Sequence, residues 1–523
     1  MTGQIMGVVK ADFYKGYDKT SIEKNKVYTV NIEDMSDEGL GIGHIEGMAV
    51  FVKDTAPGDE AEVRIVKVKK NLCYGRLERI ITPSSFRVEP FCPIAKQRGG
   101  CTLQHISYEK ELEIKKHRVL NCLSRIGGIE EPAQYLEDVY GMKSPYHYRN
   151  KMQFPVGVRG DSSKHSDKSS DVEKKYKDSF SAFSCQTKTV LGFYAGRTHS
   201  LIPITSCKIG HGVNKAVISA VTKWADKCKI SVYNEETGEG ILRHVLTRVG
   251  FVTGELMVCI VVNTKNVPEL DKLVAELSKE IDKYRAGGNN VKLKSVVMNI
   301  NKERTNRILG DKTVLINGRD YITDYIGDVK FQISAQSFYQ VNPKQTEKLY
   351  GKALEYAALT GEEIVWDMYS GIGTISLFLA QKAKKVYGVE VVAQAIDDAK
   401  INAEINDINN VEFFVGKAEE VVPLWMENRI GEYDSSSSKL HRGVDVVVVD
   451  PPRKGCDEKL LETIVKMAPK RMVYVSCDPA TLSRDLKHLL SEGFKLEKFS
   501  VYDQFSRTMH CETVCLLSNI GAD

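Results

Sequence analysis

Alternating apolar and polar residues occupy the N-terminal part of the chain, between Val27 and Ile81. Four runs show this alternation, VYTVNI, GMAVFV, EAEVRIVKV and YGRLERI, and Gly- and Asp-rich stretches such as DEGLGIGHIEG separate them. A period of two predicts strands with one buried face, and the stretches between them predict tight turns. The succession of short strands predicts a small all-β barrel over residues 20–82.

The pattern changes after Ile333. Four short apolar runs, EIVWDMY, VYGVEVV, VDVVVVD and RMVYVSC, alternate with stretches of helical character. Strands that alternate with helices are typical of a parallel sheet with helices on both faces. The sequence therefore predicts an α/β domain over residues 331–523. The intervening residues, 83–330, predict a mixed α+β region with a cysteine-bearing loop and then a polar helix from about Tyr108 to Ile126.

Two polar stretches interrupt these patterns. Residues 159–184 are rich in Ser, Lys and Asp, and they contain too few apolar residues to order themselves against a core. We therefore expect a flexible insertion there. The run DSSSSK, at residues 434–439, forms a smaller interruption inside the last domain.

Composition narrows the class of protein. A chain of 523 residues, 42% of them hydrophobic, is long enough for about three domains. No apolar run approaches the ~18 residues of a membrane span, and the N-terminus lacks a signal-peptide pattern, so we expect a cytoplasmic protein. Its 12 scattered cysteines then favour metal or nucleophile roles over disulfides. The net charge of +4 is too small to indicate a nucleic-acid partner by itself.

One part of the predicted barrel is locally basic. Tyr74 lies among basic residues of the last two strands, namely Arg64, Lys67, Lys69, Lys70, Arg76 and Arg79. Basic strands with an aromatic side chain between them suit RNA phosphates and bases. An ordinary solvent-facing strand surface would carry the same residues, so both interpretations stay open.

A glycine-containing turn follows the first strand of the α/β domain. The run VWDMY leads directly into SGIGT (370–374), and about twenty residues later the next strand ends in Glu390. Glycines let a ligand approach the backbone, and an acid at the tip of the second strand can accept both ribose hydroxyls. The order favours a nucleoside-bearing cofactor over a plain strand-to-helix turn. Because Ser376 replaces the third glycine of the dinucleotide pattern, an adenosyl cofactor without phosphates fits better.

Three more reactive groups lie at strand ends. Asp450 ends the run VDVVVVD, and the two prolines after it stiffen the loop around the acid. Cys477 ends the next strand, at the edge where parallel sheets bind ligands, which favours a reactive thiol over the commoner inert one. Glu512 begins an apolar strand beside His510, where a solvated Glu would look the same.

These motifs together resemble a known family. FYQVNP, DMYSGIGT, GVE, DPPRKG, VSCDPATLSRD and HCET occur in the order and spacing of the RNA uridine-5-methyltransferases that use S-adenosylmethionine. The N-terminal barrel resembles the OB-like TRAM module, and outside the two insertions the resemblance covers nearly the whole chain. It implies a Rossmann-like methyltransferase domain at the C-terminus. It points to the 23S rRNA branch, because the tRNA branch typically lacks the barrel and the cysteine loop.

The resemblance also implies a chemistry. Carbon 5 of uracil is too weak a nucleophile to accept a methyl group, so a thiolate first adds to carbon 6. Cys477 matches the family nucleophile, and Glu512 matches the base that removes the carbon 5 proton. The implied S-adenosylmethionine contacts are Gln340, Tyr369, Gly371, Glu390 and Asp450. Thr374 and Lys417 stand where relatives carry Asn, and they are left out of this set.

The cysteine loop CPIAKQRGGCTLQH departs from the family pattern. Iron–sulfur members carry Cys, five residues, Cys, two residues and Cys, with a fourth Cys far downstream. Here Cys92 and Cys101 occupy the outer positions and Cys207 matches the distal ligand, but Arg98 replaces the middle cysteine. A 4Fe-4S cluster normally has four thiolate ligands. The resemblance therefore leaves open a cluster with three cysteine ligands or a loop that has lost its cluster.

The sequence as a whole predicts a monomeric 23S rRNA uridine methyltransferase. A tRNA uridine methyltransferase stays open, as does an inactive RNA-binding or ribosome-assembly factor that keeps the fold. The intact Cys477, Glu512 and Asp450 argue against the inactive factor. A dehydrogenase is disfavoured, because the sequence supplies neither a pyrophosphate site nor a hydride-handling His.

Overall fold

The computed structural model describes residues 22–159, 188–196, 198–429 and 444–521. Residues 160–184 of the first predicted insertion, and all of the second, lie outside these ranges. The chain divides into two compact units, Met1–Glu89 with His105–Ser107, and Pro90–Gln104 with Tyr108–Asp523. Within the described ranges, no helix is long and apolar enough to cross a membrane.

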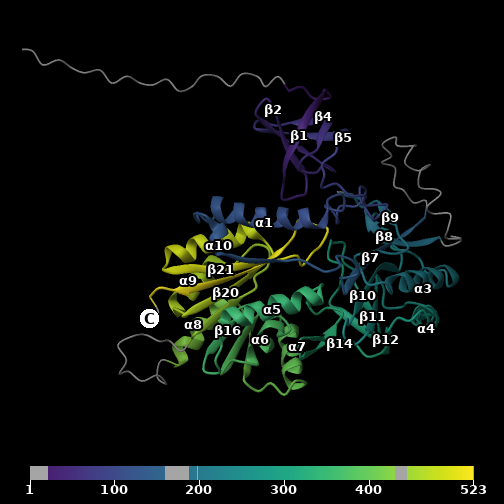
Figure 1. The fold of residues 1–523 in the computed structure, drawn as a ribbon. Helices are drawn as coiled ribbons and strands as arrows, with labels where there is room; N and C mark the ends of the chain where they lie inside the picture. The colour runs from purple at the N-terminus through teal and green to yellow at the C-terminus, as the bar shows by residue number, and fades with distance from the viewer. Residues whose placement is uncertain (1–21, 160–187, 197, 430–443, 522–523) are drawn as a thin grey trace, which may run out of the picture. The chain divides into compact units, whose positions relative to one another are not determined.

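The first unit contains a closed five-stranded barrel with the strand order β1-β2-β3-β5-β4 (Figure 1). Its strands are β1 (Val27–Met35), β2 (Gly41–Ile45), β3 (Met48–Val52), β4 (Glu60–Val68) and β5 (Leu72–Thr82). Alternate residues such as Val30, Val50 and Val63 fill the interior, so the period of two in the sequence is the period of burial. A side chain at Gly75 would collide with Val63, which explains the glycine. The predicted barrel is confirmed.

The second unit contains an eight-stranded sheet with the order β18-β17-β16-β19-β20-β22-β21-β6. The strands in that order are Val411–Val415, Lys385–Glu390, Ile364–Asp367, Val446–Val449, Arg471–Ser476, Glu512–Asn519, Phe494–Tyr502 and Leu136–Tyr140. The first five run parallel, and β22 is antiparallel to both β20 and β21. This is the predicted Rossmann-like α/β architecture.

Helices cover both faces of this sheet. One core contains Val365, Val446 and Val448 together with α5 (Pro343–Ala357), α6 (Thr374–Ala380) and α7 (Ala393–Glu404). The alternate strand residues, among them Trp366 and Val447, point into a second core. The helices of that core are α1 (Tyr108–Arg125), α8 (Ala418–Arg429), α9 (Glu458–Met467) and α10 (Pro479–Ser491). Both faces are buried, which is why these strands are continuously apolar in the sequence.

A seven-stranded sheet forms the rest of the second unit, with the order β13-β12-β11-β10-β7-β8-β9. Its strands are Lys312–Gly318, Lys292–Ile300, Glu255–Val262, Leu242–Val249, Lys151–Val158, Thr189–Tyr194 and Leu201–Pro203. Helices α3 (Asn214–Lys227) and α4 (Leu270–Ala286) pack on one face. The other face shares a core with the hairpin β14 (Tyr321–Ile326) and β15 (Val329–Ser334) and with α5 to α7. The predicted α+β character is confirmed.

Two elements that come early in the chain belong to the eight-stranded sheet. Strand β6 pairs in parallel with β21, and Val119 and Leu123 of α1 lie in the same core as α10. This arrangement could not be predicted from the sequence, because the partners are more than 350 residues away along the chain. As a result, α1 lies beside the segments that carry the candidate catalytic residues (Figure 1).

Candidate active site

The predicted cofactor turn lies at the carboxyl end of β16. Gly371 and Gly373 adopt φ values of 53° and 83°, a left-handed conformation that glycine reaches without strain. Gly373 directly precedes α6. A Cβ added to Gly371 would meet no described atom within 4 Å, so the space above this backbone is open to a ligand. The turn thus has the conformation that the SGIGT motif predicts.

Glu390, at the end of β17, lies against this turn. Its Oε2 accepts a hydrogen bond from the Gly371 backbone N at 3.3 Å, and its Oε1 accepts one from Val392 N at 2.9 Å. The carboxylate is therefore fixed at the tip of its strand while its side chain stays partly exposed. The spacing between the glycine turn and the acid brings the two together as predicted.

Two carboxyl groups lie on the neighbouring strands β16 and β19. Asp367 is fully buried, and it accepts hydrogen bonds from Ser376 Oγ at 2.6 Å and from Tyr369 N at 3.4 Å. Burial raises its pKa to about 6. Burial, and then the negative charge of Asp367, raise the pKa of Asp450 to about 7. The sequence analysis did not select Asp367, although the acid that ends the apolar run in VWDMY was a usable signal.

Cys477 and Glu512 leave adjacent strands at the same edge of the sheet. Strand β22 is antiparallel to β20, and its Thr513 pairs with Ser476. Cys477 directly follows Ser476 and Glu512 directly precedes Thr513, so the thiol and the carboxyl lie just beyond this pair. Asp478 Oδ1 accepts hydrogen bonds from Ala480 N and Thr481 N, and so it caps α10 and fixes the turn after Cys477.

The electrostatic environment of this pair is negative. Burial, then Glu512 and Asp450, raise the pKa of Cys477 to about 12, and Arg453 opposes them. Burial, then Asp450, raise the pKa of Glu512 well above its usual value. Among the described residues, Glu512 Oε2 has no hydrogen-bond partner although it is buried. A buried carboxylate oxygen without a partner is costly, and it suits a group that accepts a proton from a substrate.

His510 lies beside the pair but is held neutral. Its Nε2 lies 3.4 Å from Arg453 Nη2. Burial, followed by the positive charges of Arg453 and Arg118, lowers the pKa of His510 to about 4. Phe505 packs edge-on against the imidazole ring, with 6.3 Å between ring centroids. Neutral His510 is therefore no source of positive charge for the thiol.

Gln340 approaches the site from the segment before α5. Asn342 caps that helix by accepting a hydrogen bond from Gln345 N, and Pro343 occupies its first position. Gln340 is buried, and its Oε1 accepts a hydrogen bond from Gln504 Nε2 at 3.4 Å. Phe338, two residues earlier, has 70% of its surface exposed. This exposed ring is a feature of the FYQVNP motif that the sequence analysis did not single out.

The predicted site residues gather at one edge of the eight-stranded sheet. Tyr369 and Gly371 follow β16, Glu390 ends β17 and Asp450 follows β19. Cys477 follows β20, and Glu512 begins the neighbouring strand β22. The four parallel strands are consecutive in the sheet order, so their carboxyl ends form one ligand-binding edge. A thiol, a buried carboxyl and a glycine turn that suits a nucleoside therefore occur together at this edge.

Comparisons with known proteins agree with this geometry. Residues 239–520 match the family described as tRNA (Uracil-5-)-methyltransferase, and residues 23–77 match the TRAM domain. A Bacillus cereus protein described as "Uncharacterized RNA methyltransferase" is 45% identical over 499 residues, which cover 95% of this chain and 98% of that protein. The chain belongs to the RNA (uracil-5-)-methyltransferase family.

Other relatives extend the comparison. A Clostridium tetani protein with the same description is 43% identical over 500 residues, covering 96% of this chain and 98% of that protein. The crystal structure of Pyrococcus abyssi tRNA (uracil-54, C5)-methyltransferase in complex with S-adenosyl-L-homocysteine matches with a TM-score of 0.68 and 27% identity. That match covers 94% of this chain and 100% of the other. The chain is thus an RNA methyltransferase of the S-adenosylmethionine-dependent class.

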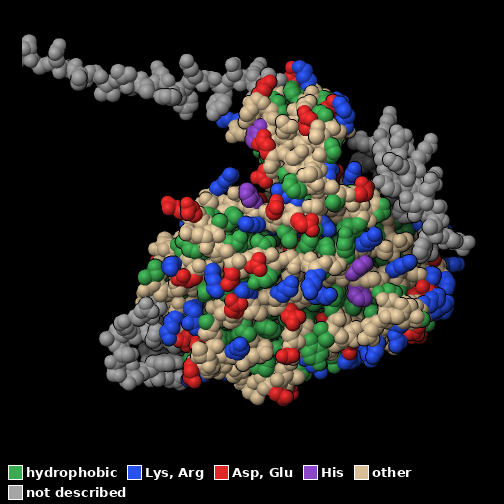
Figure 2. Space-filling view, viewed as in Figure 1, with side chains coloured by type: hydrophobic (Ala, Val, Ile, Leu, Met, Phe, Trp, Pro, Cys, Tyr) green, Lys and Arg blue, Asp and Glu red, His purple; other side chains and the backbone are tan. Residues whose placement is uncertain are grey.

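The basic residues of the TRAM barrel are partly neutralised on its surface. Arg64 and Arg76 both contact Glu78, at 2.8 and 2.9 Å, and Arg79 contacts Glu62 at 2.5 Å. Figure 2 shows Lys and Arg side chains interspersed with Asp and Glu side chains on the face in view. The sequence analysis treated the cations of these strands as a group and did not weigh the carboxylates between them. The contribution of these arginines to RNA binding remains a prediction.

The cysteine loop does not fit an iron–sulfur cluster of this family. Arg98 is buried, with its Nη1 3.7 Å from Cys207 Sγ and its guanidinium 4.1 Å from the centre of the Phe193 ring. Its charge also interacts with Cys92 and Cys101, so a cation lies among the three predicted ligands. Across the described ranges, no group of three His, Cys, Asp or Glu side chains is placed to hold a metal ion. Of the two possibilities that the resemblance left open, the iron–sulfur cluster is not supported.

Proposed function

We propose that this methyltransferase transfers a methyl group from S-adenosylmethionine to carbon 5 of a uridine in 23S rRNA, through a covalent bond between Cys477 and the uracil. The observation that carries the proposal is the pair of Cys477 and Glu512 on adjacent strands, next to Asp450 and the Gly371–Glu390 turn. A nucleophile and a base at one edge of the sheet suit an addition followed by an elimination.

The residues at the carboxyl edge fit the cofactor. The open space above Gly371 admits a ligand, and the Glu390 carboxylate at the strand tip suits ribose hydroxyls. Tyr369, Asp450 and Gln340 would complete the contacts. When bound, S-adenosylmethionine supplies an electrophilic methyl group. A positively charged sulfonium nearby would favour the ionised form of the Asp450 carboxyl.

Cys477 would begin the reaction on the uracil ring. Its sulfur forms a bond to carbon 6, the carbon 5–carbon 6 double bond opens, and the resulting enolate makes carbon 5 nucleophilic. The thiol releases its proton to solvent before this addition, and the sulfur takes up a proton again after it leaves carbon 6. Because burial and two carboxyls raise the pKa of Cys477, the ligand-free protein keeps the sulfur protonated at neutral pH.

Glu512 would end the reaction. After methylation, carbon 5 carries both a methyl group and a proton. Glu512 accepts this proton, the electron pair of the C–H bond re-forms the carbon 5–carbon 6 double bond, and the bond between carbon 6 and sulfur breaks. A carboxylate with a raised pKa is a stronger base than an ordinary one, and its Oε2 has no partner among the described residues.

The RNA must present its uridine outside the base stack. Extrusion of a base costs a few kcal/mol unless the RNA is already open, so contacts with the surrounding RNA must supply that energy. The TRAM barrel, the exposed Phe338 and the half-buried Phe505 are candidates for backbone and stacking contacts. The proposed 23S rRNA substrate rests on the TRAM barrel and the retained cysteine loop.

A tRNA substrate is the second candidate, and one observation favours it. The Pyrococcus abyssi tRNA methyltransferase matches 94% of this chain, so its match extends well beyond the methyltransferase domain. The presence of N-terminal segments therefore does not by itself select 23S rRNA.

The decisive experiment offers the purified protein both RNAs separately. Unmodified 23S rRNA and unmodified tRNA are incubated with a tritiated methyl donor, and the nucleosides are then analysed. We expect labelled 5-methyluridine in 23S rRNA alone. Label in tRNA alone would identify tRNA as the substrate in place of 23S rRNA. Label at a position of the base other than carbon 5 would refute the proposed reaction.

A cellular test addresses the non-catalytic alternative. In a deletion strain, a Cys477→Ala variant should fail to restore 5-methyluridine. If it nevertheless restored full methylation, Cys477 would not be the nucleophile. Full rescue of growth without methylation would favour a role in ribosome assembly.

A further inference from the structure

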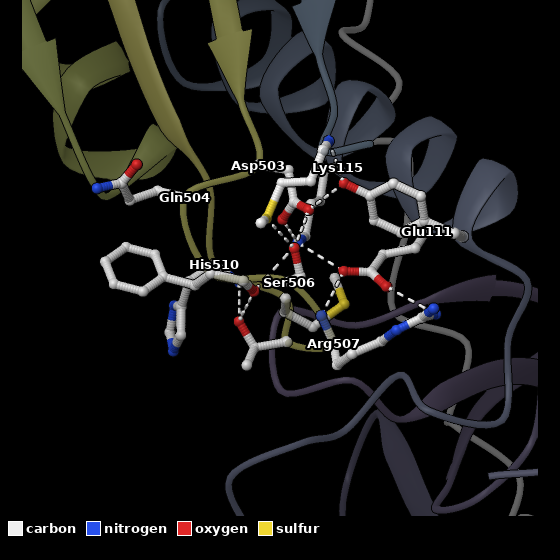
Figure 3. A network of polar contacts seen from close by, with 12 residues as sticks. Glu111, Lys115, Asp503, Gln504, Ser506, Arg507 and His510 are labelled. Carbon is white, nitrogen blue, oxygen red and sulfur yellow. Dashed lines mark hydrogen bonds and ion pairs between the residues drawn. The ribbon is translucent and has the colours of Figure 1, made fainter. Parts of the chain in front are cut away.

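A polar stripe on α1 faces the loop that leads to Glu512. Its members, at spacings of three, four and three residues, are Tyr108, Glu111, Lys115 and Arg118. These spacings place them along one face of a helix. All of them contact loop 503–511, which joins β21 to β22. Figure 3 shows Glu111 and Lys115 beside Asp503, Ser506 and Arg507 of this loop. The family motifs do not include this stripe.

Lys115 is the centre of the stripe. Its side chain is fully buried, and its Nζ donates hydrogen bonds to Asp503 Oδ1 at 2.5 Å, Glu111 Oε1 at 2.8 Å and Phe505 O at 3.3 Å. Burial disfavours the charge, but Asp503 and Glu111 outweigh it and raise the pKa of Lys115. Loss of one partner would leave a buried charge uncompensated. The network therefore holds the first half of the loop in one geometry.

Glu111 fixes a strained position in the same loop. Arg507 has a φ of 69°, a left-handed conformation that is costly for a residue with a long side chain. Its backbone N donates a hydrogen bond to Glu111 Oε1 at 2.6 Å, and its Nη1 lies 3.4 Å from Glu111 Oε2. Such a conformation persists only where the surroundings determine it. Glu111 of α1 thus holds the loop backbone at Arg507 in its left-handed conformation.

Arg118 reaches both segments that carry the proposed reacting groups. Its Nη1 donates a hydrogen bond to Met509 O at 3.2 Å, three residues before Glu512. Its Nη2 lies 3.9 Å from Asp478 Oδ2, and Asp478 directly follows Cys477. Only 9% of the Arg118 side chain is exposed. The guanidinium is a planar fork, so it can hold two acceptors in a fixed relation.

We propose that Arg118 is a positioning residue that fixes the base segment relative to the nucleophile turn. The inference rests on the proposed function. During elimination the uracil is still bonded to Cys477, so Glu512 must reach carbon 5 of a ring whose place the sulfur sets. Without the bridge, segment 509–512 can shift relative to that ring. A displacement of about 1 Å costs on the order of a hundredfold in rate.

The test compares Arg118→Met with the wild type in the full-length protein, on whichever RNA the wild type methylates. We expect kcat to fall at least tenfold while KM for RNA stays within about twofold. The methylated protein–RNA adduct should accumulate, because proton removal is slowed more than methyl transfer. It is measured as tritium in a protein–RNA complex that survives denaturation in SDS. Lys116→Met is the matched control, since Lys116 lies on the exposed face of the same helix.

Arg118→Lys provides a second variant if the methionine substitution impairs folding. A lysine ammonium can reach one of the two acceptors but cannot hold both as a fork does, so kcat should fall less. An unchanged kcat in Arg118→Met would overturn the inference, as would a raised KM at unchanged kcat, which marks an RNA contact. A lower kcat without adduct would place the fault at the nucleophile alone and would also overturn it.

Failure of the proposed function gives a different result. A folded wild type that labels neither RNA refutes both the function and the inference. A wild type that methylates RNA, combined with an Arg118→Met variant that behaves like it, refutes only the inference.

Discussion

The two thiol sites of the second unit differ in the sign of the neighbouring charge. At Cys477 the neighbours are carboxyls, and after burial the largest effects on its pKa come from Glu512 and Asp450. At Cys92 and Cys101 burial also raises the thiol pKa, but Arg98 opposes it. Cysteine motifs identify both sites in the sequence, yet the charges around the sulfurs give them opposite chemistry.

The difference shows what each site can do. Burial and the carboxyls around Cys477 raise the pKa of this thiol, so its sulfur stays protonated in the ligand-free protein. At the other site, Arg98 lies among the thiols of Cys92, Cys101 and Cys207. Its positive charge repels a metal ion, and its guanidinium packs on the Phe193 ring. The first arrangement suits covalent catalysis. The second suits a structural contact between the cysteine loop, β8 and the segment around Cys207.

The strongest test of this comparison is Cys477→Ala. Removal of the sulfur removes the covalent step, so methyl transfer should fall by about 10⁴-fold or more, while the thermal midpoint changes little. Single-turnover transfer to RNA measures the loss. The matched variant at the other site, Cys92→Ala, should keep activity within a few-fold of the wild type. A Cys477→Ala enzyme with more than a tenth of the normal rate would contradict the assignment.

Glu512→Gln should have the next largest effect. The amide cannot accept the carbon 5 proton, so kcat should fall by about 10² to 10⁴. Methyl transfer comes before proton removal, so a methylated adduct between protein and RNA should accumulate and carry tritium through denaturing electrophoresis. Glu458→Gln, an exposed change at the start of α9, is the control. A slow variant that forms no adduct would assign Glu512 to an earlier step.

At the second site, Arg98→Met should lower stability by about 2 kcal/mol. The variant loses the stacking of the guanidinium on Phe193 and its contact with Cys207, but it keeps most of the side-chain volume. Urea unfolding measures the change, with Lys96→Met as the exposed control. An unchanged stability would show that Arg98 is no structural contact.

Iron binding tests the same site independently. After anaerobic reconstitution, the wild type should hold far less than one iron per chain and show no cluster absorption. Arg98→Cys restores the fourth thiol of the family pattern and should take up iron. A fully active wild type with a complete cluster would overturn the interpretation of Arg98.

The sequence was sufficient for features that depend on local order. Strand, glycine turn, helix and acid follow one another within about twenty residues, and this order alone predicted that Gly371 and Glu390 lie together. Cys477 and Asp450 were predicted at the same edge because the ends of parallel strands meet there. In the barrel, the period of two predicted which residues are buried.

Features that depend on distant partners could not be predicted. Arg98 meets Cys207, which is 109 residues away, and Lys115 meets Asp503, which is 388 residues away. The sequence predicted a polar helix at α1, but the burial of its polar residues against loop 503–511 depends on where the helix packs. Charged residues are buried only when partners compensate them, and a single sequence does not reveal such long-range pairs.

The smallest expected effect is on the rates at which the Cys477 and Cys92 thiols are alkylated. One experiment can compare the two rates. Below the pKa of a thiol, its rate with iodoacetamide follows the thiolate fraction, so a raised pKa slows the reaction. Glu512→Gln removes a carboxyl that raises the pKa of Cys477, so alkylation of Cys477 at pH 9 should speed up by about tenfold or less. Arg98→Met should have the opposite effect on Cys92, because that thiol loses its positive neighbour.

Each variant is the control for the other site. Peptide mapping by mass spectrometry follows Cys477 and Cys92 in the same sample, so Glu512→Gln should leave the rate at Cys92 unchanged and Arg98→Met should leave the rate at Cys477 unchanged. Equal shifts at both thiols would indicate a general loosening of the fold. Opposite and local shifts would establish that the sign of the neighbouring charge, beyond burial alone, distinguishes Cys477 from the cysteines around Arg98.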